Sequence, residues 1–327
     1  MITKEQLKRC RHPRGQIIFY LAAIPIILSV LLFLGWWAIS PNSLKSIVST
    51  QVITQDVVVD LVSDDEEATE ANGEHLQKDV DMELVNLLRN DVLVPLVASP
   101  ITPIVIIILF ILFVIVIVGK TYGDSLGNGI KLSKKQFPAV YEMFDEMAKE
   151  IDLPKTPDII LMNGNGALNA FACTIPMVRD AVVIYSDIFE RCLATGDMQT
   201  LKFILGHELG HIKFKHTKWW YRFLTMPMDL IPGVNYIFAR ALSRANEYSC
   251  DKLGAKFSGD TSGKSLLILS AGKHNYQDIN LEEFMELHDR KSFWTTISNF
   301  FMDHPINSWR IIAIAKKHQG GLWFRKK

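Results

Sequence analysis

The sequence predicts an α+β fold in which two N-terminal membrane-spanning helices precede a mainly helical domain with a small sheet. Two uncharged apolar runs, residues 17–39 and 101–118, indicate the spans, since about 20 apolar residues cross the hydrocarbon core of a bilayer. The order of the remaining elements indicates the class. Short strand patterns come first and helical patterns follow, whereas a parallel sheet requires strands and helices to alternate.

Composition restricts the class of protein further. The chain has 327 residues, 35 basic and 35 acidic side chains, 49% hydrophobic residues and a mean hydropathy of +0.15. These values exclude an intrinsically disordered chain and a strongly basic nucleic-acid-binding protein, so no nucleic acid partner is expected. The four cysteines are scattered and form no CxxC pair, which favours free thiols in a reducing compartment.

The two apolar runs divide the chain. Residues 17–39 are interrupted only by Pro25, Ser29 and Gly35. A cleaved signal peptide is the alternative, but this run exceeds the usual apolar region and no small-x-small cleavage site follows it. In the second run the last fifteen residues are all β-branched, Leu or Phe. The predicted organisation is a basic N-terminus over 1–16, spans over 17–39 and 97–118, a loop over 40–96 and a domain over 119–327.

The charged residues beside the runs predict the orientation in the membrane. Five basic residues precede the first run and four follow the second within residues 120–135. Twelve acidic groups lie between the runs, in residues 41–91. Because Lys and Arg accumulate on the cytoplasmic side, both termini and the domain over 119–327 are expected in the cytoplasm, with the acidic loop outside.

The domain after the second run shows both periodicities. Apolar residues at helical spacing predict a helix over 133–151. Strand patterns follow at 158–162, 168–172 and 177–185. Helical patterns then dominate and no repeat is present; they cover 187–194, 197–216, 242–257, 263–274, 281–288 and 305–318.

The motif that indicates chemistry is His207-Glu208-Leu209-Gly210-His211, within the predicted helix 197–216. Histidines at positions i and i+4 lie on one face of a helix, which lets both bind a single ion. Glu208 lies beside them, as the general base of a metalloprotease does.

A hydrolytic zinc site needs three protein ligands and an open position. The motif that continues with glycine at position 214 and a third histidine ligand at position 217 is excluded, because Phe214 and Thr217 stand there. His216 is one residue off, and we interpret it as a histidine at the helix end.

A carboxylate from a second helix is the remaining option for the third ligand. Glu247 fits, and Asp251, one turn later, would accept a hydrogen bond from a zinc-bound imidazole. The alternative is a pair of exposed helix carboxylates beside Arg244 and Lys252.

Four motifs in order resemble the HtpX-like membrane zinc endopeptidases, gluzincin-type relatives of the CAAX prenyl proteases. They are HExxH, the ExxxD of Glu247 and Asp251, the segment Asn169-Ala170-Phe171-Ala172, and His304-Pro305 with Arg310. The resemblance covers about residues 120–320 and implies a zincin-like catalytic domain.

The resemblance also implies roles. It implies zinc on His207, His211 and Glu247, with Glu208 as the general base. It implies that Asn169 and Ala170 lie on an edge strand that binds the substrate backbone. It further implies that His304 or Arg310 lies near the oxyanion, and between these two the choice stays open.

The segment between His211 and Glu247 is short, at 35 residues, and contains Pro227, Asp229 and Pro232. A single membrane crossing here would separate the predicted ligands on opposite sides of the bilayer. We interpret residues 219–240 as a bent or interfacial segment, with ordinary core packing as the alternative.

These patterns together indicate a membrane-anchored, zinc-dependent endopeptidase with one Zn²⁺ per chain, acting on proteins or peptides at the bilayer of the cell membrane. The resemblance suggests membrane protein quality control. A catalytically silent zinc-binding adaptor is the alternative, although structural sites are usually closed by four ligands rich in Cys. A transporter is disfavoured because neither span contains an ionisable residue.

Overall fold

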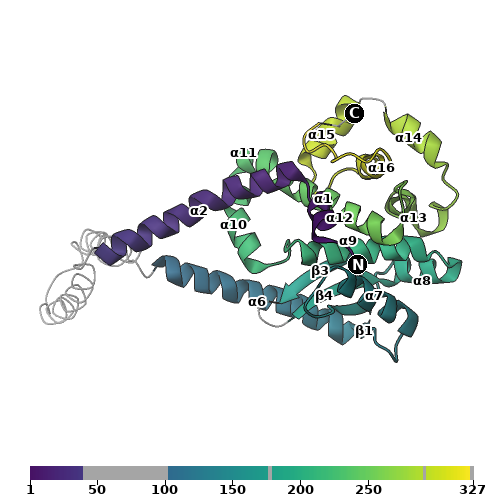
Figure 1. The fold of residues 1–327 in the computed structure, drawn as a ribbon, viewed down its shortest axis with the longest axis horizontal. Coiled ribbons are helices and arrows are strands. Elements are labelled where there is room, and N and C mark those ends of the chain that lie inside the picture. Colours follow the sequence, from purple (N-terminus) through teal and green to yellow (C-terminus); the bar gives the residue numbers. More distant parts are fainter. Residues whose placement is uncertain (40–101, 176–178, 290–291, 325–327) are drawn as a thin grey trace, which may run out of the picture. The chain divides into compact units, whose positions relative to one another are not determined.

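The computed structural model describes residues 1–39, 102–175, 179–289 and 292–324. The chain forms two compact units, one of residues 1–24 and 113–327 and the other of residues 25–112. The larger unit contains the sheet, the predicted motif helix and the helices that follow it (Figure 1). The predicted acidic loop over 40–96 lies outside the described residues.

One described helix is long and apolar enough to cross a membrane, namely Ile104–Asn128 within α6 (Thr102–Asn128). It contains the end of the predicted second span and continues for ten residues beyond it. The first predicted span lies on α2 (Pro13–Ile39), whose recognised apolar stretch, Pro13–Ser29, is shorter. The arrangement with two spans therefore stays a prediction.

The sheet is small and mixed. Its strands are β1 (Gly129–Lys131), β2 (Asp158–Met162), β3 (Ala170–Ile175) and β4 (Arg179–Tyr185), in the order β1-β2-β4-β3. β2 and β4 are parallel, with Ile160 opposite Val183, and the two outer pairs are antiparallel. The three predicted strands are confirmed; β3 starts and ends later than predicted, and the first two residues predicted for β4 lie outside the described residues. β1 was not predicted because three residues show no alternation.

Most predicted helices are present, with shifted ends. The helix predicted over 133–151 is α7 (Pro138–Glu150), which starts late because Phe137 has a left-handed backbone and proline occupies the first helical position. The motif helix α9 (Met198–Lys213) ends three residues early, since Lys215 also has a positive φ of 68°. The pattern at 263–274 divides into η3 (Lys264–Leu266) and α13 (Leu267–Asn275).

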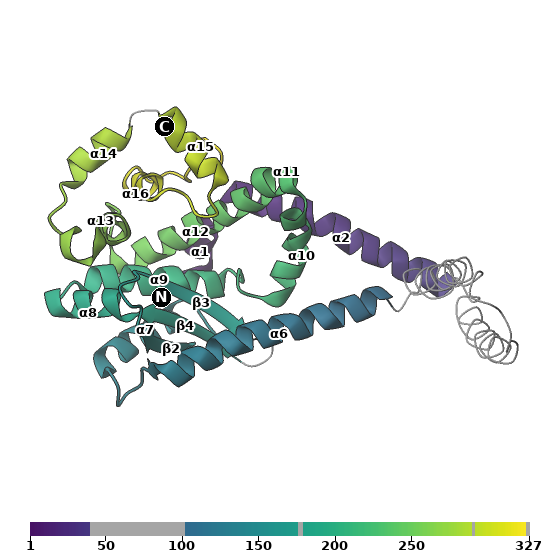
Figure 2. The ribbon, with the colours of Figure 1, turned by 180° about the vertical axis from the view of Figure 1, so that it is seen from behind.

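The other helices of this unit complete the mainly helical domain. They are α8 (Ser186–Thr195), α10 (Trp219–Leu230), α11 (Pro232–Val234), η2 (Asn235–Ala239), α12 (Arg240–Ser258), α14 (Leu281–Asp289), α15 (Phe293–Phe301) and α16 (Asn307–Ala315). The segment 219–240 is bent, as predicted, because α10 ends before Pro232 and short turns lead into α12 (Figure 2).

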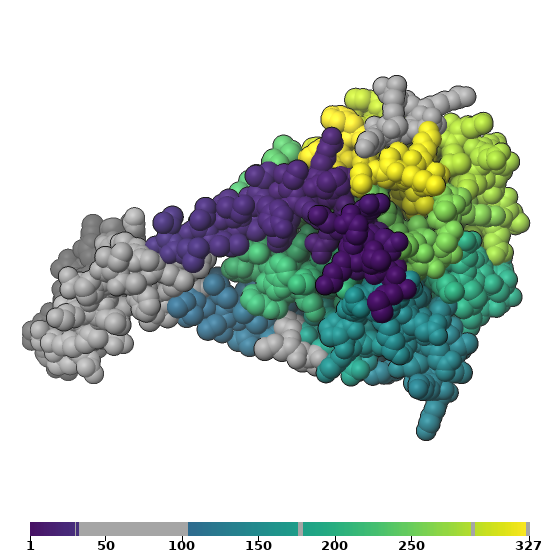
Figure 3. All heavy atoms as spheres, in the orientation of Figure 1, coloured from purple at the N-terminus to yellow at the C-terminus, as the bar shows by residue number. Residues whose placement is uncertain are grey.

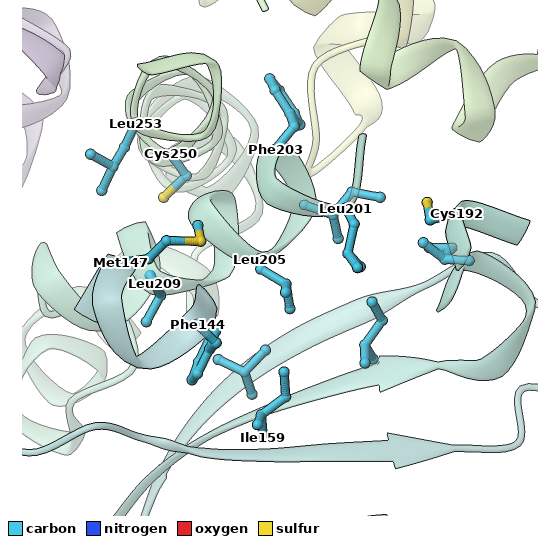
Figure 4. Packing of buried hydrophobic residues seen from close by; sticks show 14 of the residues in the cluster. Phe144, Met147, Ile159, Cys192, Leu201, Phe203, Leu205, Leu209, Cys250 and Leu253 are labelled. Atoms are coloured by element: carbon cyan, nitrogen blue, oxygen red, sulfur yellow. The ribbon is translucent and has the colours of Figure 1, made fainter. Parts of the chain in front are cut away.

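The main core lies between the sheet and α7, α9 and α12. Leu201, Leu205 and Leu209 of α9 are fully buried and lie toward the strand that carries Ile159, while α7 contributes Phe144 (Figure 4). Complete burial of one leucine stabilises a fold by about 1.5–3 kcal/mol. This leucine stripe fixes the rotation of α9 and therefore the direction of its opposite face.

The N-terminal residues 1–24 belong to the same compact unit as residues 113–327. The backbone N–H of Ile2 donates to the Glu150 carbonyl at 3.0 Å, and that of His12 donates to Ser249 Oγ at 2.9 Å. Leu7 of α1 (Lys4–Cys10) is buried in the main core. Figure 3 shows these residues lying between the surface formed by α7 and that formed by the C-terminal residues.

Candidate metal centre

The first part of the site is α9 itself. Asp197 caps its N-terminus by accepting the Thr200 N–H at 2.9 Å, and the motif His207–His211 lies in the C-terminal half of the helix. The leucine stripe faces the core, so His207 and His211, four residues apart, both face α12. Their Nε2 atoms lie 3.2 Å from each other.

A close crossing of α9 and α12 brings the second set of side chains to the histidines. A Cβ at Gly254 of α12 would lie 2.6 Å from the Phe203 carbonyl oxygen, and one at Gly210 of α9 would lie 3.1 Å from Cys250 Sγ. Only glycine therefore allows this separation at Gly254. The crossing places Glu247 and Asp251 of α12 opposite the histidine pair.

Three donor groups converge at this crossing. Glu247 Oε2 lies 3.4 Å from His207 Nε2, and Glu247 Oε1 lies 3.3 Å from His211 Nε2. A tetrahedral zinc ion with bonds of about 2.0–2.1 Å spaces its ligand atoms about 3.3–3.4 Å apart. The donor set and its spacing therefore fit such an ion.

A carboxylate orients the first histidine. His207 Nδ1 lies 2.9 Å from Asp251 Oδ1, so the ring directs Nε2 toward Glu247. Arg310 of α16 holds Asp251 through two hydrogen bonds, from Nε to Oδ2 at 2.8 Å and from Nη2 to Oδ1 at 2.6 Å. All three side chains are buried, and such contacts fix the tautomer and raise the basicity of a ligating imidazole.

A histidine, His216, contacts the second ligand candidate. Its Nδ1 lies 3.3 Å from His211 Nδ1, and Cys250 Sγ lies 3.8 Å from the same atom. The turn that carries His216 is held at Thr217, whose Oγ1 lies 2.6 Å from Thr174 Oγ1 of β3. The sequence predicted only a histidine at the helix end. The contact with His211 was not predicted, because it forms only when the chain turns back after Lys215.

A different triad, His207, His211 and Cys250, also has ligand atoms within 4.8 Å of one another. Glu247 is the better third ligand because its oxygens lie at 3.3–3.4 Å from both Nε2 atoms. Burial also raises the pKa of Cys250 well above its usual range, which disfavours the thiolate that binds metals.

The charges at the centre favour a cation. Burial raises the pKa of a carboxyl group, but the contacts of Glu247 with His207 and His211 outweigh burial and hold its pKa well below the usual range. Burial conversely lowers the pKa of His207, yet Glu247 and Asp251 raise it to about 10. The carboxylates therefore stabilise positive charge at the histidine pair, whether a proton or a metal ion supplies it.

Glu208 lies between the two histidines on α9 and is buried. Within the described residues, no hydrogen bond or ion pair engages its carboxylate. Its carboxylate is therefore available to accept a proton.

The structure brings the predicted oxyanion candidates to the same carboxylate. His304 Nδ1 lies 3.1 Å from Glu247 Oε2, and its side chain is 64% exposed. Arg310 Nη2 lies 3.5 Å from the same oxygen, but its side chain is only 7% exposed and is held by Asp251. His304 is therefore the candidate that a solvent-borne substrate can reach.

The predicted substrate-binding residues lie at the start of an edge strand. Ala170 is the first residue of β3, the last strand in the order of the described sheet. Asn169 precedes it and accepts the Tyr185 N–H at 3.0 Å, which extends the pairing with β4. The other edge of β3 has no strand partner among the described elements.

Two histidines one turn apart on α9 face a glutamate of α12, and a further glutamate lies between them in the sequence. This arrangement is typical of a metallopeptidase. The chain belongs to peptidase family M48, whose profile matches residues 134–231 and 222–318. Family membership implies a hydrolase of peptide bonds.

The chain is also similar to plastoglobule-localized metallopeptidase 48, chloroplastic, of Arabidopsis thaliana. The two are 24% identical over 175 residues, which cover 50% of this chain and 49% of that relative. The chain thus spans about half the length of this curated relative. No solved structure was found to match the chain.

Proposed function

We propose that the protein is a membrane-anchored, zinc-dependent endopeptidase of the HtpX-like type. The observation that supports this most is the spacing of 3.2–3.4 Å among His207 Nε2, His211 Nε2 and the Glu247 carboxylate, next to an unpaired Glu208. Three ligands leave one position open, as hydrolysis requires. When bound, zinc polarises the scissile carbonyl and makes water more acidic.

The residues of the chain then have separate tasks. Glu208 accepts the proton of the attacking water and delivers a proton to the leaving amine. His304, exposed and beside Glu247, donates to the oxygen that becomes negatively charged. Asp251 and Arg310 hold His207 in one orientation, so Arg310 acts as a positioning residue in this proposal.

The substrate in this proposal is an extended protein or peptide. Its backbone pairs with the free edge of β3 at Asn169 and Ala170, so main-chain hydrogen bonds supply most of the binding. Because these bonds do not involve the side chains of the substrate, we expect little sequence preference. The membrane-capable helix supports a location at the bilayer, with the domain in the cytoplasm as the charge bias predicts. Cleavage of damaged membrane proteins is the biological use we propose.

A catalytically silent zinc-binding adaptor is the second candidate. Such a protein has no need for an open ligand position or for a buried, unpaired carboxylate at Glu208. These two features favour the peptidase.

The test is cleavage of casein by the full chain purified in detergent. We expect internal cleavage, identified by mass spectrometry of the products, that stops with a zinc chelator and returns with added zinc. Stoichiometric zinc without hydrolysis of casein or of a membrane protein would favour the adaptor.

A further inference from the structure

A cavity lies in the larger unit, away from the proposed metal-binding side chains. It has a volume of about 360 Å³ and is formed by α1, the first residues of α2 and the C-terminal end of α9. Cavities of about 300–1,000 Å³ are the usual size of small-molecule sites. The proposed peptidase chemistry makes no use of this cavity.

The lining of the cavity is strongly basic. Four cations line it, namely Lys4, Lys8 and Arg11 from the N-terminal segment and Lys213 from α9, against the single carboxylate of Asp152. Within the described residues, none of the three N-terminal cations forms an ion pair. The Lys213 amine donates to the backbone carbonyl of Asp152 at 3.2 Å, which leaves its charge without a paired carboxylate. The cavity therefore holds an excess of positive charge that an anion would neutralise.

Part of the lining of the cavity is apolar. Leu7 and Phe214 line it and are buried, with 8% and 4% exposure. The Arg11 guanidinium lies 5.2 Å from the centre of the Phe214 ring, a cation–π distance that orders the cation before any ligand binds. An anion whose charged group is joined to a small apolar part would match both surfaces.

The place of the cavity in the chain points to the source of that anion. Gln16 lines the cavity, and Ile17, the next residue, begins the uncharged run of α2. Ile17, Tyr20, Leu21 and Ile24 are each at least 50% exposed, so α2 leaves the cavity with an apolar surface. In the proposed membrane anchoring, Gln16 lies where the headgroups begin. Basic pockets at that level bind anionic lipid headgroups.

We propose that this cavity binds a phosphate-bearing anion, for which the headgroup of an anionic phospholipid is the favoured source and soluble phosphate the other. Guanidinium and ammonium groups are the side chains that bind phosphate oxygens. The cavity and its charges do not depend on the proposed peptidase activity, whereas the preference for lipid rests on the proposed membrane anchor. Binding is therefore measured without reference to hydrolysis.

The experiment uses the full chain in a non-ionic detergent and three probes: dioctanoyl phosphatidylglycerol, dioctanoyl phosphatidylcholine and inorganic pyrophosphate. Isothermal titration calorimetry measures the affinity for each. We expect the phosphatidylglycerol probe to bind at least about tenfold more tightly than the zwitterionic probe. If pyrophosphate displaces the phosphatidylglycerol probe, the ligand is a soluble phosphate. If pyrophosphate does not displace it, the ligand is the lipid headgroup.

Two double variants distinguish binding in the cavity from nonspecific attraction of anions to the basic N-terminal segment. Lys8→Gln with Arg11→Gln removes two cations that line the cavity, and Arg9→Gln with Arg14→Gln removes two exposed cations of the same segment that do not. We expect the first pair to weaken anion binding at least about tenfold and the second to change it less than about twofold. Lys213→Gln, on α9, should repeat the loss if the first variant unfolds, which thermal melting detects. Equal losses in both pairs, or no preference for the anionic probes, would overturn the proposal.

Discussion

His216 Nδ1 lies 3.3 Å from His211 Nδ1, whereas the corresponding nitrogen of His207 lies 2.9 Å from the Asp251 carboxylate. The two histidines of one motif thus have different partners. With zinc on Nε2, as proposed, His211 Nδ1 would donate this hydrogen bond and His216 Nδ1 would accept it. Burial and the neighbouring His211 hold the pKa of His216 well below its usual range, so the acceptor is neutral.

This contact predicts that His216 supports zinc binding without being a ligand. Replacing His216 by Phe removes the acceptor and should weaken zinc affinity about tenfold, since loss of such an orienting partner typically costs about 10–100-fold. His216→Gln, which keeps an acceptor, should recover part of the affinity, and His274→Phe at an exposed position should have no effect. Competition with a fluorescent chelator gives these affinities. Equal affinity in the Phe variant and the wild type would refute the role.

Glu208→Gln should keep stoichiometric zinc and lose at least about a hundredfold in casein hydrolysis. The amide has nearly the same shape but cannot take the proton of the attacking water, and a general base contributes about 10²–10⁴-fold. Metal analysis and initial rates on the same preparation check both statements. Hydrolysis at the wild-type rate would exclude Glu208 as the base.

Glu247→Ala should abolish zinc retention, because it removes one of the three groups within 3.4 Å of one another. Asp251→Asn should weaken retention about 10–100-fold, since Asp251 contacts His207 and lies outside the proposed set of three ligands. Zinc content after dialysis against a chelator ranks the two. The opposite order would reverse the assignment of ligand and orienting group.

The Asp251 variant needs a control for folding, because Arg310 would lose its partner in a buried place. Breaking a buried ion pair on one side costs about 3–5 kcal/mol, while replacing both partners with apolar residues is often neutral. Asp251→Leu with Arg310→Met should therefore melt near the wild-type temperature and still bind zinc weakly. Wild-type zinc affinity in this double variant would show that the pair serves stability alone.

Gly254→Ala should weaken both folding and zinc binding. The added methyl group would lie 2.6 Å from the Phe203 carbonyl oxygen, so α9 and α12 must separate. Overpacking of this kind costs about 1–3 kcal/mol. Gly127→Ala is the matched control, since nothing lies within 4 Å of its added methyl group. A Gly254→Ala protein with wild-type melting temperature and zinc content would contradict the close crossing.

The predicted topology places the domain in the cytoplasm and the loop 40–96 outside. Single cysteines at Ser63, in that loop, and at the exposed Glu286 of α14 test it with a membrane-impermeant maleimide on intact cells. Cys10, Cys192 and Cys250 are buried, so Cys173 is the background thiol to replace, and the protein without added cysteines is the control. We expect labelling at 63 only. Labelling at 286 with protection at 63 until lysis would invert the topology.

The sequence by itself determined the local features of this protein. The apolar runs, the strand at 158–162 and the helix with histidines at 207 and 211 follow from periodicity, because spacing along the chain fixes which side chains share a face. Glu247 and Asp251 were also predicted as a pair, since they lie one helical turn apart. Phe137 and Lys215 set the helix ends through left-handed backbone conformations that periodicity does not record.

The tertiary structure decided every contact between distant segments. Arg310 lies 59 residues from Asp251 along the chain, and its burial against that carboxylate depends on how α16 packs on α12. The approach of His216 to His211 depends on a turn that β3 holds at Thr174. The docking of α1, which forms the basic cavity, joins residue 12 to residue 249. Such contacts arise from the packing of whole elements, and short-range spacing carries no information about which elements will meet.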